Sequence, residues 1–163
     1  MAGMFPTMVS DPNDPNRRRA EPVGDTWPAP LRRAHRLVIA AAVLMLVAGM
    51  VMLTAGFPEG ADEAFRAAFM RNMRFAAWSN IVLGLALGAA AAYLQRGSKV
   101  ARRWVAVFAA AAIFVNIAAF ALRVSSWASF VIVVVLAVAL WLAFRPASNA
   151  YVDEKHSLWR GLK

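Results

Sequence analysis

The chain has 163 residues, of which 61% are hydrophobic and only 17% are charged, with a net charge of +9 and a mean hydropathy of +0.53. A soluble domain is nearer half apolar and a quarter charged, and the apolar residues here form long runs almost without charge, so the composition excludes an ordinary soluble domain and indicates membrane-spanning helices. The basic residues flank those runs, where they set topology and meet anionic headgroups, and we therefore exclude a nucleic-acid partner.

Residues 1–31 are predicted to form a largely disordered cytoplasmic tail. They hold six of the eight prolines and few apolar residues, so they cannot bury a core. The arginines at 17–19 suit the anionic inner leaflet of a membrane.

The first predicted span covers residues 37–57, which contain no charge. It follows three arginines and ends where Pro58 and Gly60 stop a helix. The apolar run is too long for a signal peptide and follows a long polar segment, so we expect an uncleaved anchor.

The segment that follows predicts an amphipathic helix on the outer surface. Asp62 and Glu63 favour a helix start, and the spacing of the apolar residues places them on one face. Such a face rests on lipid or docks a partner, and the sequence leaves both open. The candidate docking residues are Phe65, Arg66, Phe69 and Met73.

The second predicted span, residues 75–94, carries a stripe of small and polar residues at every fourth position. The glycine pair in this stripe allows close helix contact, so we expect this helix to be the most buried. The stripe consists of Ala76, Asn80, Gly84, Gly88 and Ala92.

Residues 104–144 form one nearly continuous apolar run, which as a single helix would be about 60 Å long, twice the hydrocarbon thickness of a bilayer. We therefore predict a helical hairpin with spans 104–122 and 127–144 and a tight turn at Arg123. In its first arm, Asn116 is expected to form an interhelical hydrogen bond, as is Asn80 in the preceding span.

The C-terminal segment, residues 146–163, is predicted to be a short cytoplasmic helix capped by Ser148 or Asn149. An apolar face of such a helix must be covered by lipid headgroups or by another protein. Its members are Tyr151, Leu158 and Leu162, with Trp159 beside them.

The distribution of Lys and Arg predicts the orientation. The N-terminal segment carries six, the connection 96–103 four and the C-terminal segment four, which leaves four of the 18 for the other two connections. By the positive-inside rule both termini are cytoplasmic. The expected fold is all-α: a four-helix transmembrane bundle over 32–145 with an outer amphipathic helix, in a bacterial inner membrane.

The sequence predicts no catalytic, cofactor or metal site. No ionisable residue lies in the middle of a span, there is no cysteine, and the two histidines lie outside the spans. We therefore expect a non-enzymatic accessory subunit of a larger membrane complex, of respiratory or cell-envelope type, whose partners are membrane lipids and other membrane subunits. The alternatives are a small homo-oligomeric transporter or channel lined by Asn80 and Asn116, and a lipid-modifying enzyme that uses Glu59, Asp62 or Glu63.

Overall fold

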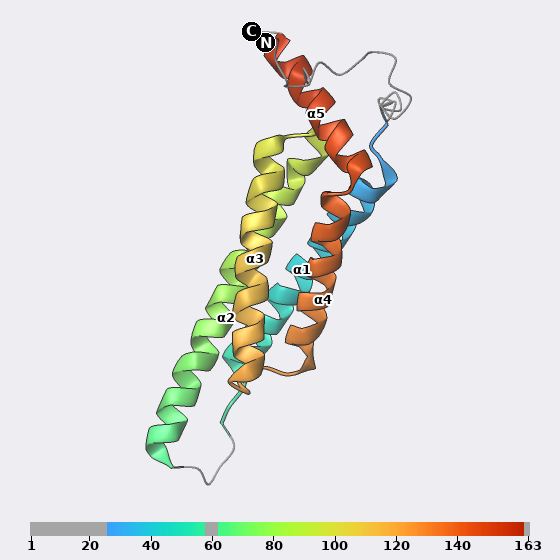
Figure 1. Cartoon of the computed structure of the whole chain (residues 1–163). Coiled ribbons are helices and arrows are strands. Elements are labelled where there is room, and N and C mark those ends of the chain that lie inside the picture. The colour runs from blue at the N-terminus through green and yellow to red at the C-terminus, as the bar shows by residue number, and fades with distance from the viewer. Residues whose placement is uncertain (1–25, 58–61, 162–163) are drawn as a thin grey trace, which may run out of the picture.

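The computed structural model describes residues 26–57 and 62–161, with side chains as far as Lys155, and within these ranges it contains helices and no strand. Four long helices are followed by a shorter one that lies at an angle to them (Figure 1). The elements are α1 (Ala29–Thr54), α2 (Glu63–Ala92), the 3₁₀ turn η1 (Leu94–Arg96), α3 (Lys99–Ala121), α4 (Trp127–Ala143) and α5 (Pro146–Gly161).

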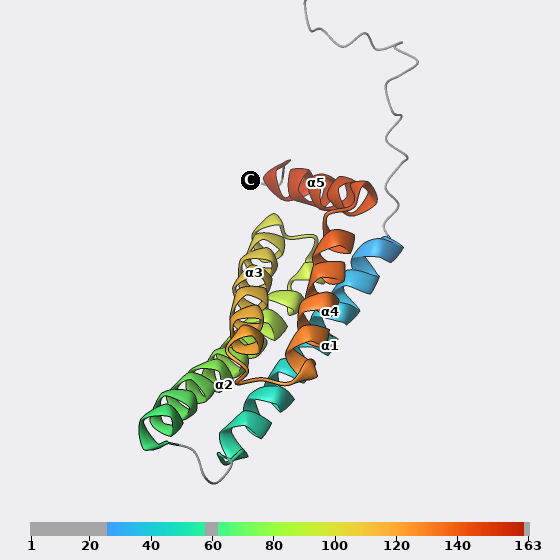
Figure 2. The ribbon, with the colours of Figure 1, turned by 60° about the horizontal axis from the view of Figure 1, so that its bottom comes forward.

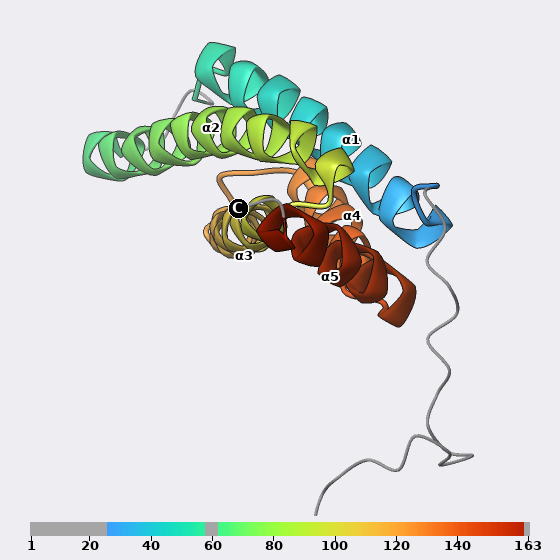
Figure 3. The same ribbon diagram turned by 90° about the horizontal axis from the view of Figure 1, so that it is seen from above.

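The four long helices form an up-down-up-down bundle in which each packs against its two neighbours, so that α1 also contacts α4. We call the end where α1 begins and α4 ends the α5 end, and the opposite end, with the α3–α4 turn, the turn end (Figure 1). Helix α5 is bent by 60° from α4 and lies across the α5 end (Figures 2 and 3).

Local sequence explains where the helices of the second half begin and end. Ser98 caps α3 by accepting from the Ala101 amide at 3.2 Å, and Gly97 adopts the left-handed conformation (φ 67°) that ends the preceding 3₁₀ turn. Helix α3 ends in a Schellman motif, because Val124 N–H donates to the Ala119 carbonyl and Arg123 itself is left-handed (φ 55°). The predicted tight turn at Arg123 is thus present, with arginine at a position that usually holds glycine.

The core of the bundle consists mainly of alanine with a few large side chains. Met45, Leu87, Ile132 and Leu136 are completely buried among alanines of all four helices. Large apolar side chains instead point outward along the whole bundle, for example Phe75, Phe114 and Trp141. Among the described residues, three helices are long and apolar enough to cross a membrane, and a fourth qualifies if α4 and α5 are taken as one bent segment.

The helices begin and end differently from the prediction at three places. Helix α1 begins at Ala29, inside the range predicted as a disordered tail, and residues 1–25 of that tail lie outside the described part. The amphipathic segment predicted to lie on the surface is instead continuous with the second span: residues 63–74 are the first turns of α2. Helix α5 begins at Pro146, a residue suited to the first turn because its missing N–H would have no partner there.

Candidate functional site

A network of buried polar side chains connects three helices inside the bundle. Asn116 of α3 donates its side-chain amide to Asn80 Oδ1 of α2 at 2.9 Å, and Ser129 of α4 donates to Asn116 Oδ1 at 2.8 Å. All three side chains are completely buried. The Ser129 hydroxyl also contacts Ser125, and because its proton goes to Asn116, Ser125 is the donor in this second bond.

The side-chain amides of Asn80 and Asn116 also donate hydrogen bonds to backbone carbonyls of their own helices, so more of their hydrogen-bonding groups have partners. Asn80 donates to the Ala76 carbonyl at 3.1 Å and Asn116 to the Ala112 carbonyl at 2.9 Å. Buried amides satisfied in this way hold helices in register rather than bind a ligand. The prediction of an interhelical bond is therefore confirmed, whereas a path lined by these two residues would require them to leave this enclosed arrangement.

The predicted stripe on α2 packs along only part of its length. Ala76, Asn80 and Gly84 are buried, but a Cβ at Gly88 would meet no atom within 4 Å, and Ala92 is exposed. Residues four apart differ in direction by 40° because a turn has 3.6 residues, so a straight four-residue stripe winds away from the neighbouring helix.

The close approach of α1 and α2 depends on a glycine from each helix, one of which the sequence analysis missed. A Cβ at Gly84 would lie 3.1 Å from the Ala42 carbonyl of α1, and one at Gly49 would lie 2.8 Å from the Ala77 carbonyl of α2. The first predicted span contains two glycines, and Gly49 is the one that lies away from its end, which is the signal that could have identified it.

The predicted docking residues at the turn end are divided between surface and core. Phe65 is 60% exposed and Arg66 is exposed, whereas Met73 is buried in a core cluster and is not available for docking. Phe69 is half-buried because Phe57, which follows α1, packs against it with ring centroids 5.0 Å apart. Much of the predicted amphipathic face is therefore covered by the chain itself.

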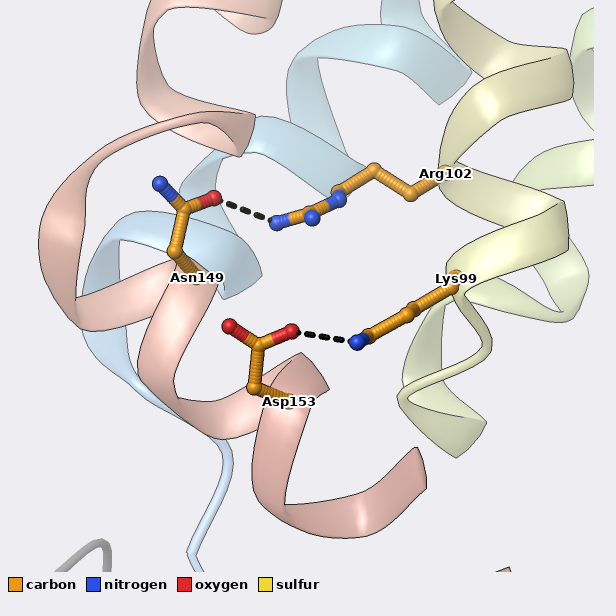
Figure 4. A network of polar contacts seen from close by, with 4 residues as sticks. All are labelled: Lys99, Arg102, Asn149 and Asp153. Atoms are coloured by element: carbon orange, nitrogen blue, oxygen red, sulfur yellow. Dashed lines mark hydrogen bonds and ion pairs between the residues drawn. The ribbon is translucent and has the colours of Figure 1, made fainter. Parts of the chain in front are cut away.

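At the α5 end, two polar contacts attach α5 to α3 (Figure 4). Lys99 Nζ lies 2.7 Å from Asp153 Oδ1, and Arg102 Nη1 donates to Asn149 Oδ1 at 2.6 Å. The Arg102 guanidinium also lies over the Phe144 ring, 5.0 Å from its centroid. These contacts fix α5 against the beginning of α3.

The residues predicted to cap α5 have a different role. Ser148 donates to the Leu142 carbonyl at 3.0 Å and Asn149 donates to the Phe144 carbonyl at 3.1 Å. Both therefore satisfy the last carbonyls of α4, which have no partner within their own helix. The prediction of a helix was right and the assignment of its cap was wrong, because the helix begins at Pro146.

Tyr151 is the one residue of the predicted apolar face of α5 whose side chain the structure describes, and it points into the protein. Tyr151 is buried with Leu31 and Leu94, so it contacts α1 and η1 rather than lipid or a partner. The side chains of Leu158 and Trp159 lie outside the part that the structure describes.

His35 joins α1 to the end of α2 and uses both ring nitrogens within the chain. Nδ1 lies 3.1 Å from the Ala91 carbonyl, which only accepts, so Nδ1 carries the proton and Nε2 accepts from Gln95 at 3.4 Å. Trp27 packs edge-on to the same ring at 5.2 Å. Both ring nitrogens of His35 are therefore used within the chain, and neither is left for a metal.

The acids considered for catalysis lie at the start of α2. Asp62 and Glu63 are exposed, and Glu63 borders a hollow that also contains Arg66 and Met70, while Glu59 lies outside the described residues. Within the described ranges, no three His, Cys, Asp or Glu residues come together as a metal site would require.

A larger groove opens at the turn end between α1, α4 and the α3–α4 turn. Its volume is about 550 Å³. Its walls are apolar, and Arg123 is its only charged lining residue among those described. Arg123 was expected at a turn, but no pattern in the sequence predicts this groove.

Comparisons with protein-family models, with curated proteins and with solved structures found no match to this chain.

Proposed function

We propose that the chain is a four-span protein of a bacterial inner membrane, with both termini cytoplasmic, and that it serves as a non-enzymatic accessory subunit of a larger membrane complex of respiratory or cell-envelope type. Embedding in lipid is supported by the outward-facing apolar side chains of α1–α4, since a soluble monomer rarely exposes a continuous apolar patch above about 600 Å². The orientation is supported by the basic residues gathered at the α5 end, where α5 binds Lys99 and Arg102.

The observation that carries the accessory role is the self-sufficiency of the bundle interior. The buried polar residues of the described ranges are Asn80, Asn116, Ser129 and Ser148, none of which titrates near neutral pH. Each is hydrogen-bonded within the chain. The interior thus holds helices together, and contacts with other molecules are left to the surface.

The beginning of α2 is the surface best suited to a partner. Its first turns project past the α3–α4 turn (Figures 1 and 2), so Phe65 and Arg66 stand beyond the hairpin formed by α3 and α4. An exposed aromatic residue beside an arginine is a combination enriched at protein interfaces.

The experiment is crosslinking in the native membrane. A photoreactive residue at Phe65 should give a discrete crosslink to one larger membrane protein, which should also co-purify with a tagged copy in mild detergent. The same residue at Val107, an equally exposed position on α3, serves as the matched control and should crosslink mainly to lipid. Self-crosslinks alone, or a chain that purifies only as a monomer, would contradict the accessory role.

A further inference from the structure

The groove at the turn end has the chemistry of an amphiphile-binding site. We call it the turn-end groove; Leu44, Val47 and Val51 of α1 form one wall and Ala128 and Val131 of α4 the other. Polar groups are confined to its third side, the α3–α4 turn. They are contributed there by Arg123, Ser125 and Ser126.

The polar side of the turn-end groove is positively charged. No acidic residue of the described ranges lines the groove, and Arg123 has no ion pair with a described carboxylate. The backbone conformation of Arg123 is also unusual. Arg123 occupies the left-handed position of a Schellman motif, where glycine or asparagine is usual. A bulky residue in a left-handed conformation points to a role for its side chain.

We infer that the turn-end groove binds one anionic phospholipid, with an acyl chain along the apolar walls and its phosphate at the Arg123 guanidinium. Guanidinium groups bind phosphate through paired, charge-assisted hydrogen bonds, and the hydroxyl of Ser126 at the same rim is a further donor. This inference rests on the proposed membrane embedding, in which Arg123 reaches the outer headgroup level.

The distribution of polar groups favours a lipid over a partner helix. The α1 and α4 walls of the groove are apolar, and its polar groups are gathered at the α3–α4 turn, where Arg123 and Ser126 lie. A phospholipid has the same division, with one charged phosphate above an apolar chain.

The test uses the full-length protein, extracted in mild detergent and stripped of lipid. Native mass spectrometry with equimolar phosphatidylglycerol and phosphatidylcholine of identical acyl chains should show one phosphatidylglycerol retained with a preference of about tenfold, because the quaternary ammonium of phosphatidylcholine repels Arg123 whereas phosphatidylglycerol carries the phosphate charge alone. Arg123→Gln should remove the preference. Arg74→Gln, which removes an exposed charge from α2 near the same end but outside the groove, should leave it unchanged.

A second variant tests the apolar part of the site. Ala128 is exposed to the groove, so Ala128→Phe should fill the space without disturbing the core and should abolish retention of the lipid. Unchanged retention in this variant would overturn the site. Equal retention of both lipids by the unaltered chain, or loss of the preference in Arg74→Gln as well, would also overturn it.

One outcome would overturn both the lipid site and the proposed function, and another separates them. A chain recovered without detergent in the soluble fraction would overturn both. A photoreactive residue at Val131 in native membranes should crosslink to lipid; a crosslink to another protein would assign the groove to a partner and overturn the lipid site while leaving the accessory role intact.

Discussion

The Asn116 side chain bonds to Asn80 at 2.9 Å in a region where both are completely buried, and it thereby ties α3 to α2. Replacing Asn116 with alanine leaves the Asn80 carbonyl oxygen and the Ser129 hydroxyl without that partner. We expect Asn116→Ala to lower the free energy of unfolding by about 1–2 kcal/mol, as measured by unfolding in mixed micelles.

A double-mutant cycle with Asn80→Ala should give a coupling energy of about 1 kcal/mol, because the two changes remove one shared bond. Asn72→Ala, on the same helix but outside the network, is the matched control and should have little effect. Strictly additive losses at positions 80 and 116 would show that the bond contributes nothing to stability.

Gly49 allows the closest approach of α1 to α2. An added Cβ would lie 2.7 Å from a side-chain carbon of Ile81 and 2.8 Å from the backbone oxygen of Ala77. We expect Gly49→Ala to lower the free energy of unfolding by about 1–3 kcal/mol through overpacking. Gly88→Ala is the control: its Cβ would meet nothing within 4 Å, so stability should be unchanged or slightly raised by helix propensity.

Hydrophobic run length was sufficient to predict the long helices, because the number of apolar residues needed to cross a bilayer is a simple physical constraint. It could not predict which face of each helix is buried. Apolar residues surround these helices on all sides, so periodicity carries little information, and the winding of the stripe on α2 turned Ala92 outward.

The role of Tyr151 was also beyond the sequence. Its burial depends on the 60° bend between α4 and α5, which brings it against Leu31 from the opposite end of the chain. Contacts between residues so far apart in sequence leave no local pattern. The contacts of Ser148 and Asn149 with α4 were also not predicted. The sequence placed the start of the last helix at one of these two residues, whereas α5 begins earlier, at Pro146.

Arg102 makes one of the polar attachments of α5 to α3. Arg102→Gln removes its charged hydrogen bond to Asn149 and its contact with the Phe144 ring. We expect amide hydrogen exchange in residues 147–155 to become about tenfold faster, while exchange in α2 stays unchanged. Arg103→Gln, an exposed neighbour, should not alter exchange in α5, and an equal increase there would point to a general charge effect.

Arg123 and Gly97 are the two described residues with positive φ. Arg123→Gly should raise the free energy of unfolding by about 1 kcal/mol, because glycine adopts the left-handed conformation without steric conflict. Gly97→Ala should lower it by at least as much, since its Cβ would also come within 2.8 Å of Lys155 Cβ. Thermal unfolding of the two variants in one detergent provides the comparison, and a destabilised Arg123→Gly protein would mean that the arginine stabilises the turn.

The orientation in the membrane can be tested directly because the chain has no cysteine, so a cysteine introduced by mutation is the only one that a thiol reagent can label. Three exposed positions suit this test. Gly56→Cys and Leu122→Cys place the cysteine at the turn end, and Arg103→Cys places it at the α5 end. In intact cells, a membrane-impermeant maleimide should label the first two and not the third. Labelling of Gly56→Cys without Leu122→Cys would exclude the four-span arrangement.

Helices α4 and α2 differ greatly in length. Helix α4 has 17 residues and extends about 26 Å, whereas the 30 residues of α2 extend about 45 Å. In the proposed embedding, α4 is shorter than the hydrocarbon layer of about 30 Å and α2 is longer, so the bilayer would thin beside α4, whereas α2 would be accommodated by tilt or by the projection of its first turns. A neighbouring protein that covers the thin side would release that elastic deformation, so hydrophobic mismatch by itself favours association along α4.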